Sequence, residues 1–499
     1  MSSTKASWTG LPPSVRHQIL DLLLLEGRSL TGFATVSREW QGVIEPYTFA
    51  RITLTPSRLA HSEAILSRKR SLVRYIWLRF ELERYDCTLC ATKDPDLWGM
   101  SGIDSEFVME SFQSLFSALS QWEPSGDLIL DISVYSPSDP SHWFKYLDLE
   151  PDIPPAESSF PPQPPAWFPA DDPSHGWIGG RQETAPNSDA LEKPFEEIMC
   201  QGPFEKEELE MQWWRGLPPI PAITGVLLRQ QTRRRWRPNA LAAMFGRLPN
   251  LKEVCYEPWR EWAGMEQCTD QKNKELIVSL GQGNLRRLVI FENFNEHYPP
   301  QYMDCDPVRP PNAVLSLKLA RASLQLEALS ASYMVDASYF FQQACIPYLN
   351  WPNLRSLALT SWLLDPSTRA ANIDGMLLDA ATVVLKMPKL ETMEIWNGRE
   401  GLAVLFRYQA SRAGQPAVIT LRGTFKLALR PAVARAWIAV AGEHRVVVRS
   451  SSVDASIIRS HGDAICHLGL SAHVVRPVSL RQILKEHRAR AEGVLDKQM

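Results

Sequence analysis

The chain has 499 residues, and its net charge of −3 is too small to draw the whole protein toward nucleic acid or an anionic membrane. Its 44% hydrophobic and 22% charged residues are typical of globular proteins, and the length exceeds that of one ordinary domain core. The 38 prolines predict many short elements joined by turns.

Residues 8–50 form the first predicted unit, which is small and helical. A helix with Ser14 as its N-cap is expected to run to Gly27, because serine favours this position and glycine ends helices. A second helix follows and is expected to close at Pro46.

The first of these helices carries more apolar surface than its own unit can bury. At 100° per residue its aliphatic side chains sweep an arc of roughly 200°, whereas a helix facing one core needs about 100° or a little more. One side of this arc can face the second helix, and the other side requires another domain or a partner protein. The arc consists of Val15, Ile19, Leu20, Leu22, Leu23 and Leu24.

The next segment, residues 51–150, shows alternating strand and helix patterns and is predicted to be α/β. Residues 151–205 are predicted to be a proline-rich loop or an insertion, since nine of the 23 residues from 151 to 173 are proline. The expected elements of the α/β segment are a short strand and a turn at 51–59, a helix from 62 that leads into a strand near 73–78, a helix at 105–122 and a strand at 128–135.

Residues 206–478 contain a degenerate repeat, in which a leucine is followed by two polar residues and then by two apolar residues one apart. Each copy predicts a strand, with helices expected between the copies, including 372–386 and 399–412, and closing strands at 418–423 and 444–451. One such unit cannot bury its apolar face alone, so stacked units share a core. The leading leucines are Leu251, Leu285, Leu326, Leu354 and Leu390, and earlier copies lie at 71–78 and 221–228.

This repeat is similar to the strand signature of leucine-rich repeats, with longer and less regular units. The predicted fold class is therefore α/β, with the small N-terminal helical unit followed by an irregular leucine-rich-repeat-like solenoid. An ordinary α/β domain with buried parallel strands is the alternative. Residues 479–499 are expected to be a C-terminal helix or tail.

The N-terminal unit resembles an F-box. The pattern opens with Leu-Pro, places an Ile-Leu pair about eight residues on, and ends with Val-Ser/Cys-x-x-Trp. The whole chain is similar to a large group of fungal F-box proteins with divergent leucine-rich C-terminal regions. The matching residues are Leu11-Pro12, Ile19-Leu20 and Val36-Ser37-Arg38-Glu39-Trp40.

The resemblance implies an adaptor and not an enzyme. An F-box docks on the Skp-type adaptor of a Skp–cullin–F-box ubiquitin ligase, and through it on a cullin, while the C-terminal region holds a protein substrate. A scaffold that never joins a ligase is the alternative, and neither nucleic acid nor a membrane is an expected partner. The residues expected to bind the Skp-type adaptor are Leu11, Pro12, Ile19, Leu20, Leu24, Val36 and Trp40.

Motifs of catalysis and cofactor binding are absent from the sequence, so we predict no catalytic residue, no cofactor and no metal. Cys87-x-x-Cys90 is a lone pair, whereas structural zinc needs four ligands. Semi-buried thiols are the favoured interpretation, and a metal shared with distant histidines is the alternative. His461-Gly-Asp463 is interpreted as a turn, because no nucleophile accompanies it.

Two further signals concern the surface of the molecule. Residues 233–237, Arg-Arg-Arg-Trp-Arg, are interpreted as the exposed end of a strand with arginines paired to glutamates, and a phosphate contact or nuclear signal is the alternative. The pairs Trp213-Trp214 and Trp259-x-x-Trp262 are expected to pack between repeats, and exposed binding anchors on a concave face are the alternative. The start of the chain has no apolar leader, so we expect free thiols and a cytoplasmic or nuclear location.

Overall fold

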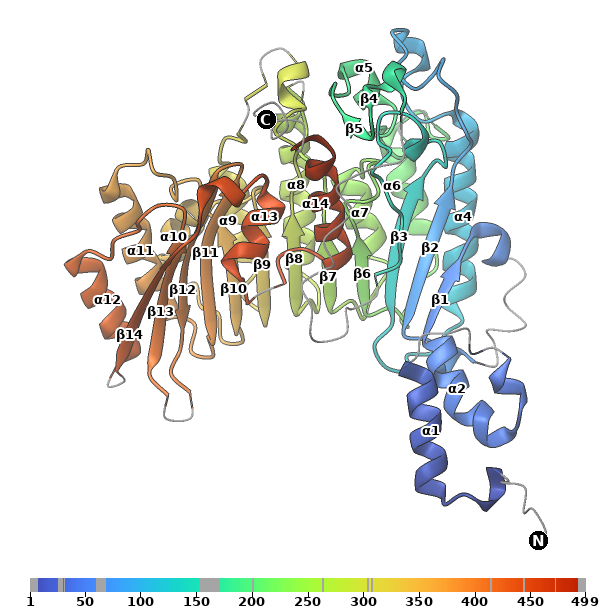
Figure 1. The fold of residues 1–499 in the computed structure, drawn as a ribbon, viewed down its shortest axis with the longest axis horizontal. Helices are drawn as coiled ribbons and strands as arrows, with labels where there is room; N and C mark the ends of the chain where they lie inside the picture. The colour runs from blue at the N-terminus through green and yellow to red at the C-terminus, as the bar shows by residue number, and fades with distance from the viewer. Residues whose placement is uncertain are drawn as a thin grey trace.

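A sheet of 12 strands runs through the part of the chain that the computed structural model describes (Figure 1). Chain neighbours are also neighbours in the sheet, and all pairs are parallel except β11–β12 and β12–β13. Helices alternate with these strands, so the predicted α/β class is confirmed. The described residues are 8–25, 30, 32–59, 69–152, 171–199, 202–262, 264–302, 305–306, 308–412, 415–442, 445–471 and 473–491.

The strands lie in chain order across the sheet, and their bounds show how short most of them are. They are β1 (Arg51–Leu54), β2 (Tyr75–Glu81), β3 (Ile129–Tyr135), β6 (Gly225–Leu228), β7 (Glu253–Tyr256), β8 (Arg287–Phe291), β9 (Ala328–Ser332), β10 (Ser356–Thr360), β11 (Thr392–Arg399), β12 (Leu402–Gln409), β13 (Ala417–Gly423) and β14 (Val446–Ser452).

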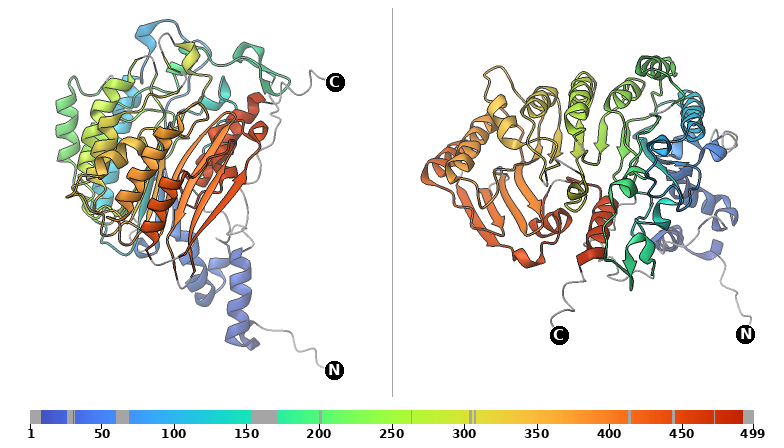
Figure 2. Two further views of the ribbon diagram at one scale, coloured as in Figure 1. Left: turned by 90° about the vertical axis from the view of Figure 1, so that its left-hand side faces the viewer. Right: turned by 90° about the horizontal axis from the view of Figure 1, so that it is seen from above.

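Two sets of helices cover opposite faces of the sheet (Figure 2). The connecting helices lie on the outer face, whereas α13 (His461–Leu468) and α14 (Pro477–Ala491) return across the other face, which we call the inner face. The outer helices are α4 (Gly102–Ser120), α6 (Glu207–Gly216), α7 (Pro238–Phe245), α8 (Glu266–Leu280), α9 (Ala313–Ala322), α10 (Ala337–Ala344), α11 (Ala370–Val384) and α12 (Pro431–Ala441).

Each predicted leading leucine lies two residues before the first residue of a strand. Leu251 precedes β7, for example, and Leu354 precedes β10. The first residues of β6 to β11 pair directly with one another, so the repeated pattern sets the register of the sheet. The residues at this position are all buried: Val73, Ile223, Leu251, Leu285, Leu326, Leu354 and Leu390.

The helix predicted at 399–412 is wrong, because this segment is strand β12. The run from Leu402 to Phe406 is buried throughout, as expected of a strand covered on both faces. Gly401, at φ +70°, makes the tight turn that lets β12 pair antiparallel with β11. Burial on both faces therefore overrides the helical spacing read from the sequence.

Strands β3 and β6 pair directly, so the insertion predicted at 151–205 falls between two neighbouring strands of the sheet. The described part holds a short hairpin, β4 (Trp177–Ile178) with β5 (Arg181–Gln182), and helix α5 (Ser188–Glu192). The proline-rich stretch at 153–170 and the helix expected from residue 62 to 68 lie outside the described residues. Because one sheet spans the segments before and after the insertion, these two segments share a core.

The N-terminal helices differ in detail from the prediction. Helix α1 (Pro13–Leu25) begins one residue before Ser14, so Ser14 is not its N-cap. Helix α2 (Arg38–Ala50) begins after Ser37, whose Oγ accepts a hydrogen bond from the Trp40 N–H. It continues through Pro46, which removes a single N–H donor, and it leads directly into β1.

The length and hydropathy of a helix decide whether it could cross a membrane. Within the described residues, no helix is both long enough and apolar enough to cross a bilayer.

Candidate functional site

The N-terminal unit of α1, the short 3-10 turn Phe33–Thr35 and α2 extends beyond one end of the sheet (Figure 1). Val15, Ile19 and Leu22 stand at helical spacing on one side of α1. Leu22 is 62% exposed and Val15 is 36% exposed, whereas Leu20, on the other side of the helix, is fully buried. The unit therefore leaves part of its apolar arc uncovered, as the helix periodicity predicted.

The interior of this unit is built around Trp40. Its ring lies 4.9 Å from that of Trp8 and 5.9 Å from that of Phe33, measured between centroids. The neighbouring carboxylate of Glu39 accepts hydrogen bonds of 3.0 Å from the indole of Trp8 and from the guanidinium of Arg16. Trp40 therefore packs α2 against the residues before α1 and the 3-10 turn before α2, and Glu39 links α2 to α1.

The residues predicted to bind a Skp-type adaptor differ in burial and fall into three groups. Leu20 is buried inside the chain and is not an accessible contact, so this part of the prediction needs correction. Leu22, which the prediction omitted, is 62% exposed, more than any other aliphatic residue from Val15 to Leu24. Of the other predicted residues, Pro12 and Val36 are exposed, and Leu11, Ile19, Leu24 and Trp40 are half-buried.

The unit is anchored to the sheet through α2. Ile44 is buried, and Glu45 forms an ion pair with Lys69 just before β2. Helix α2 also runs without a break into β1. It therefore connects α1, with its exposed aliphatic residues, directly to the sheet.

The arginine run at 233–237 is not an exposed strand end. Arg233 and Arg234 are buried, and they lie in the segment that follows β6. Arg233 donates a 2.7 Å hydrogen bond to Glu486 of α14, and Arg234 lies 3.2 Å from Asp139. The predicted pairing with acidic residues is thus confirmed, and the predicted exposure is wrong. The other arginines of the run pair likewise, Arg235 with Glu261 and Arg237 with Glu197 and Glu210.

The tryptophan pairs are packing residues. Trp214 is fully buried under α4, and Trp259 and Trp262 are buried around the ring of Phe195. His461, interpreted from the sequence as part of a turn, is instead the first residue of α13 and lies with its Nε2 2.8 Å from Asn293 Oδ1.

A cavity of about 250 Å³ opens where β8 to β11 end. Much of its wall comes from residues at or just after the carboxyl ends of four adjacent parallel strands, the position at which open α/β sheets commonly bind ligands. Aromatic and charged side chains alternate around it, which suits a ligand with apolar and polar groups. Prominent lining residues are Glu292, Phe294, Arg309, Tyr333, Trp362 and Arg399.

The wall of this cavity contains a strained residue. Tyr333 has φ +67°, a conformation that costs of order 1–3 kcal/mol for a residue other than glycine. Its hydroxyl donates a 2.9 Å hydrogen bond to the Gly398 carbonyl at the end of β11, which holds the ring across the cavity wall. Such strain is found most often at binding sites.

Glu292, which lines the cavity, is expected to make stability depend on pH. Burial raises its pKa from 4.5 to about 7, although Arg309, whose Nε lies 3.1 Å away, opposes this shift. The folded state therefore favours the protonated acid, and stability falls as pH rises between these two values. The pKa difference corresponds to about 3 kcal/mol.

We expect Glu292→Gln to remove this dependence, because glutamine reproduces the neutral acid at every pH. Relative to the unchanged protein, the variant should gain up to about 3 kcal/mol in free energy of unfolding between pH 4.5 and pH 8. Urea unfolding at both pH values measures the gain. An equal effect of the substitution at the two pH values would contradict the expectation.

Comparison with known proteins gives one family match. The model of a family of unknown function, DUF6546, matches residues 281–476. This range runs from the end of α8 to the residue before α14, so it includes the strands that form the cavity and excludes the N-terminal unit. No curated protein matches the chain.

Proposed function

We propose that this chain recruits protein substrates to a Skp–cullin–F-box ubiquitin ligase. In this proposal the N-terminal unit is an F-box that docks on a Skp-type adaptor, and the strand–helix units after it are a leucine-rich-repeat-like arc that holds the substrate. The apolar stripe of Val15, Ile19 and Leu22 carries the proposal, because Val15 and Leu22 are exposed and Ile19 between them is half-buried. Exposed aliphatic side chains on a helical unit that extends from the sheet are suited to a partner.

The arrangement of the two parts supports this division of roles. The N-terminal unit lies at one end of the strands, whereas the cavity lined by Phe294, Tyr333 and Trp362 opens at the opposite, carboxyl end. A partner on α1 and a segment of substrate in the cavity would therefore not compete for the same surface. Such an adaptor would act in the cytosol or the nucleus.

The proposal predicts loss of adaptor binding when the stripe is charged. Burying one large aliphatic side chain is worth roughly 1.5–3 kcal/mol, so Leu22→Glu should weaken binding about 10–100-fold. Leu22→Glu combined with Val36→Glu should abolish it. Both residues are exposed, so circular dichroism and the urea midpoint should stay unchanged.

Capture of a purified Skp-type adaptor by the full-length protein measures this effect. Ile438→Glu is a matched control, because Ile438 is 52% exposed on α12 near the other end of the sheet. If the unchanged protein does not bind the adaptor, the proposal fails. Adaptor binding without cullin association would instead identify the scaffold alternative.

A further inference from the structure

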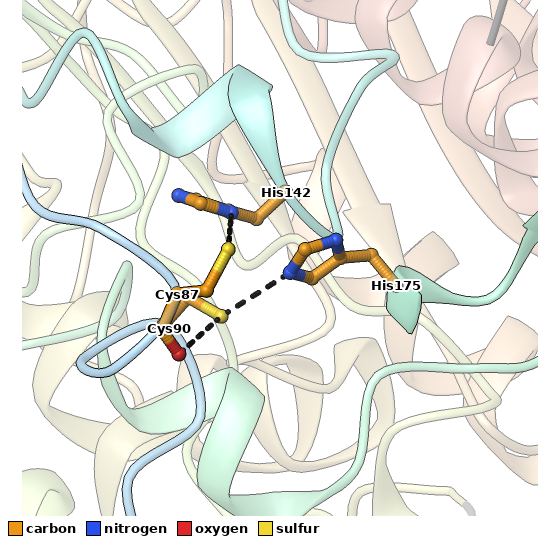
Figure 3. A group of neighbouring side chains, drawn as sticks. All are labelled: Cys87, Cys90, His142 and His175. Carbon is orange, nitrogen blue, oxygen red and sulfur yellow. Dashed lines mark hydrogen bonds between the residues drawn. The ribbon is translucent and has the colours of Figure 1, made fainter. Parts of the chain in front are cut away.

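Four side chains that bind metals converge at the carboxyl ends of β2 and β3 (Figure 3). Cys87 and Cys90 lie in the turn that follows β2, His142 follows β3, and His175 precedes β4. One ligand atom from each residue lies within 4.8 Å of every other. In the sequence, His142 is 55 residues from Cys87, and His175 is 85 residues from Cys90. The two cysteines, which have no metal-binding neighbour in the sequence, therefore have two histidine partners in the fold.

Two of the distances between ligand atoms match the sulfur–nitrogen edges of a zinc tetrahedron, and all of them are within 4.8 Å. Zinc bonds of about 2.3 Å to sulfur and about 2.0–2.1 Å to nitrogen, at a tetrahedral angle, place sulfur and nitrogen about 3.6 Å apart. Cys87 Sγ lies 3.6 Å from His142 Nδ1, and Cys90 Sγ lies 3.4 Å from His175 Nε2. A metal can thus enter with small movements of the side chains.

The surroundings orient these ligands. Asp172 Oδ2 lies 2.7 Å from His175 Nδ1, so this nitrogen donates to the carboxylate and leaves Nε2 to face the thiols. A carboxylate behind a histidine is the common second partner at zinc sites. Lys145, 2.9 Å from the same carboxylate oxygen, holds Asp172 in place.

The thiol pair is also held by its own turn. The Cys90 N–H donates to the Asp86 carbonyl at 3.1 Å, and the Thr88 N–H donates to the Asp86 side chain at 2.8 Å. Cys90 and both histidines are buried, whereas Cys87 is exposed and offers a path for an ion to enter.

We propose that Cys87, Cys90, His142 and His175 bind one structural zinc ion. Two thiols and two imidazoles are a typical closed set for this metal, with no open position for catalysis. Each thiol loses its proton on binding, so two protons leave and the two thiolates balance the charge of Zn²⁺. The ion would join the loop after β2, the loop after β3 and the start of the β4–β5 hairpin.

Metal analysis of the full-length protein tests the proposal. The protein is produced without a histidine tag, with zinc in the medium, and is purified under reducing conditions without chelator. Elemental analysis should find about one zinc ion per chain. Cys90→Ser and His175→Gln should each lower this content at least tenfold, whereas Cys268→Ser, which changes an exposed cysteine on α8, should leave it unchanged.

A second measurement uses the unchanged protein and does not depend on whether the variants fold. After removal of zinc by a chelator, Co²⁺ should produce the visible absorption bands of tetrahedral cobalt and a thiolate charge-transfer band. Added Zn²⁺ should abolish these bands and restore the thermal midpoint lost on chelation. The proposal is overturned if the protein binds neither ion, if Cys90→Ser keeps a full complement of zinc, or if mass analysis finds a disulfide between Cys87 and Cys90.

Discussion

Replacing Arg233 by methionine should destabilise the protein by about 3–5 kcal/mol, because it leaves the carboxylate of Glu486 buried without its cation. Glu486 accepts 2.7 Å hydrogen bonds from Arg233, from Asn295 and from the hydroxyl of Tyr298. Burial alone would raise its pKa, but Arg233 and these neighbours hold the pKa below its ordinary value. The urea midpoint at pH 7 measures the loss.

The same variant should reverse the response to acid. In the unchanged protein, the lowered pKa of Glu486 gives stability that is present above its ordinary value of 4.5 and is lost as the pH falls through the folded value. Without Arg233, burial favours the neutral acid, so acid should stabilise the variant relative to pH 7. Adding Glu486→Leu should recover most of the loss, since well-packed apolar groups commonly replace a buried ion pair at little cost.

A loss of less than 1 kcal/mol in Arg233→Met would show that the ion pair does not hold α14 to the sheet. The aromatic rings around the guanidinium, whose centroids lie 4.5 Å away at Trp259 and 4.9 Å away at Phe144, would then account for its burial. The recovery in the double variant separates these two explanations, because cation–π contacts are lost in both variants.

Trp214→Ala should cost a further independent 3–5 kcal/mol, the usual range for removing a buried tryptophan. The indole lies under α4, with its ring centroid 5.0 Å from Phe112 and 6.2 Å from Phe116. Its Nε1 also donates a 3.1 Å hydrogen bond to Glu210, which the substitution would remove. The large loss is expected because α4 and α6 cannot both collapse into the space left behind.

Urea unfolding followed by circular dichroism measures this change as well. Trp362→Ala is the matched control, because Trp362 is 47% exposed, and its effect should stay within about 0.5 kcal/mol. Equal effects at Trp214 and Trp362 would show that the core between α4 and α6 is not packed as described.

The strand pattern was readable in the sequence because it depends on local spacing. Leu251, Leu285 and Leu326 each stand two residues before a strand, and a buried leading residue in every unit repeats at the same place in the register. The prediction failed at 402–409, where the apolar residues are also spaced as in a helix. Spacing alone does not separate a strand buried on both faces from a buried helix.

Two clusters whose partners the sequence did not reveal depend on the path of the chain. Arg233 meets Glu486 across 253 residues, and Cys90 meets His175 across 85 residues. No local periodicity links such positions, so the arginine run resembled a surface patch and the cysteines resembled a lone pair. A CxxC pair at the carboxyl end of one strand, with a histidine after the next strand, is the signal that would have indicated the metal site.

Local spacing was sufficient to determine the α/β class, the positions of the repeated strands and the excess apolar arc of α1, because these follow from contacts a few residues apart. The folded chain decided which residues of that arc face solvent, since Leu20 turns inward and Leu22 outward. It also decided the burial of the arginines beneath α14 and the meeting of two thiols with two imidazoles. These contacts form only when residues far apart in the sequence come together in the fold. The residues next to each group in the sequence therefore do not indicate its partner.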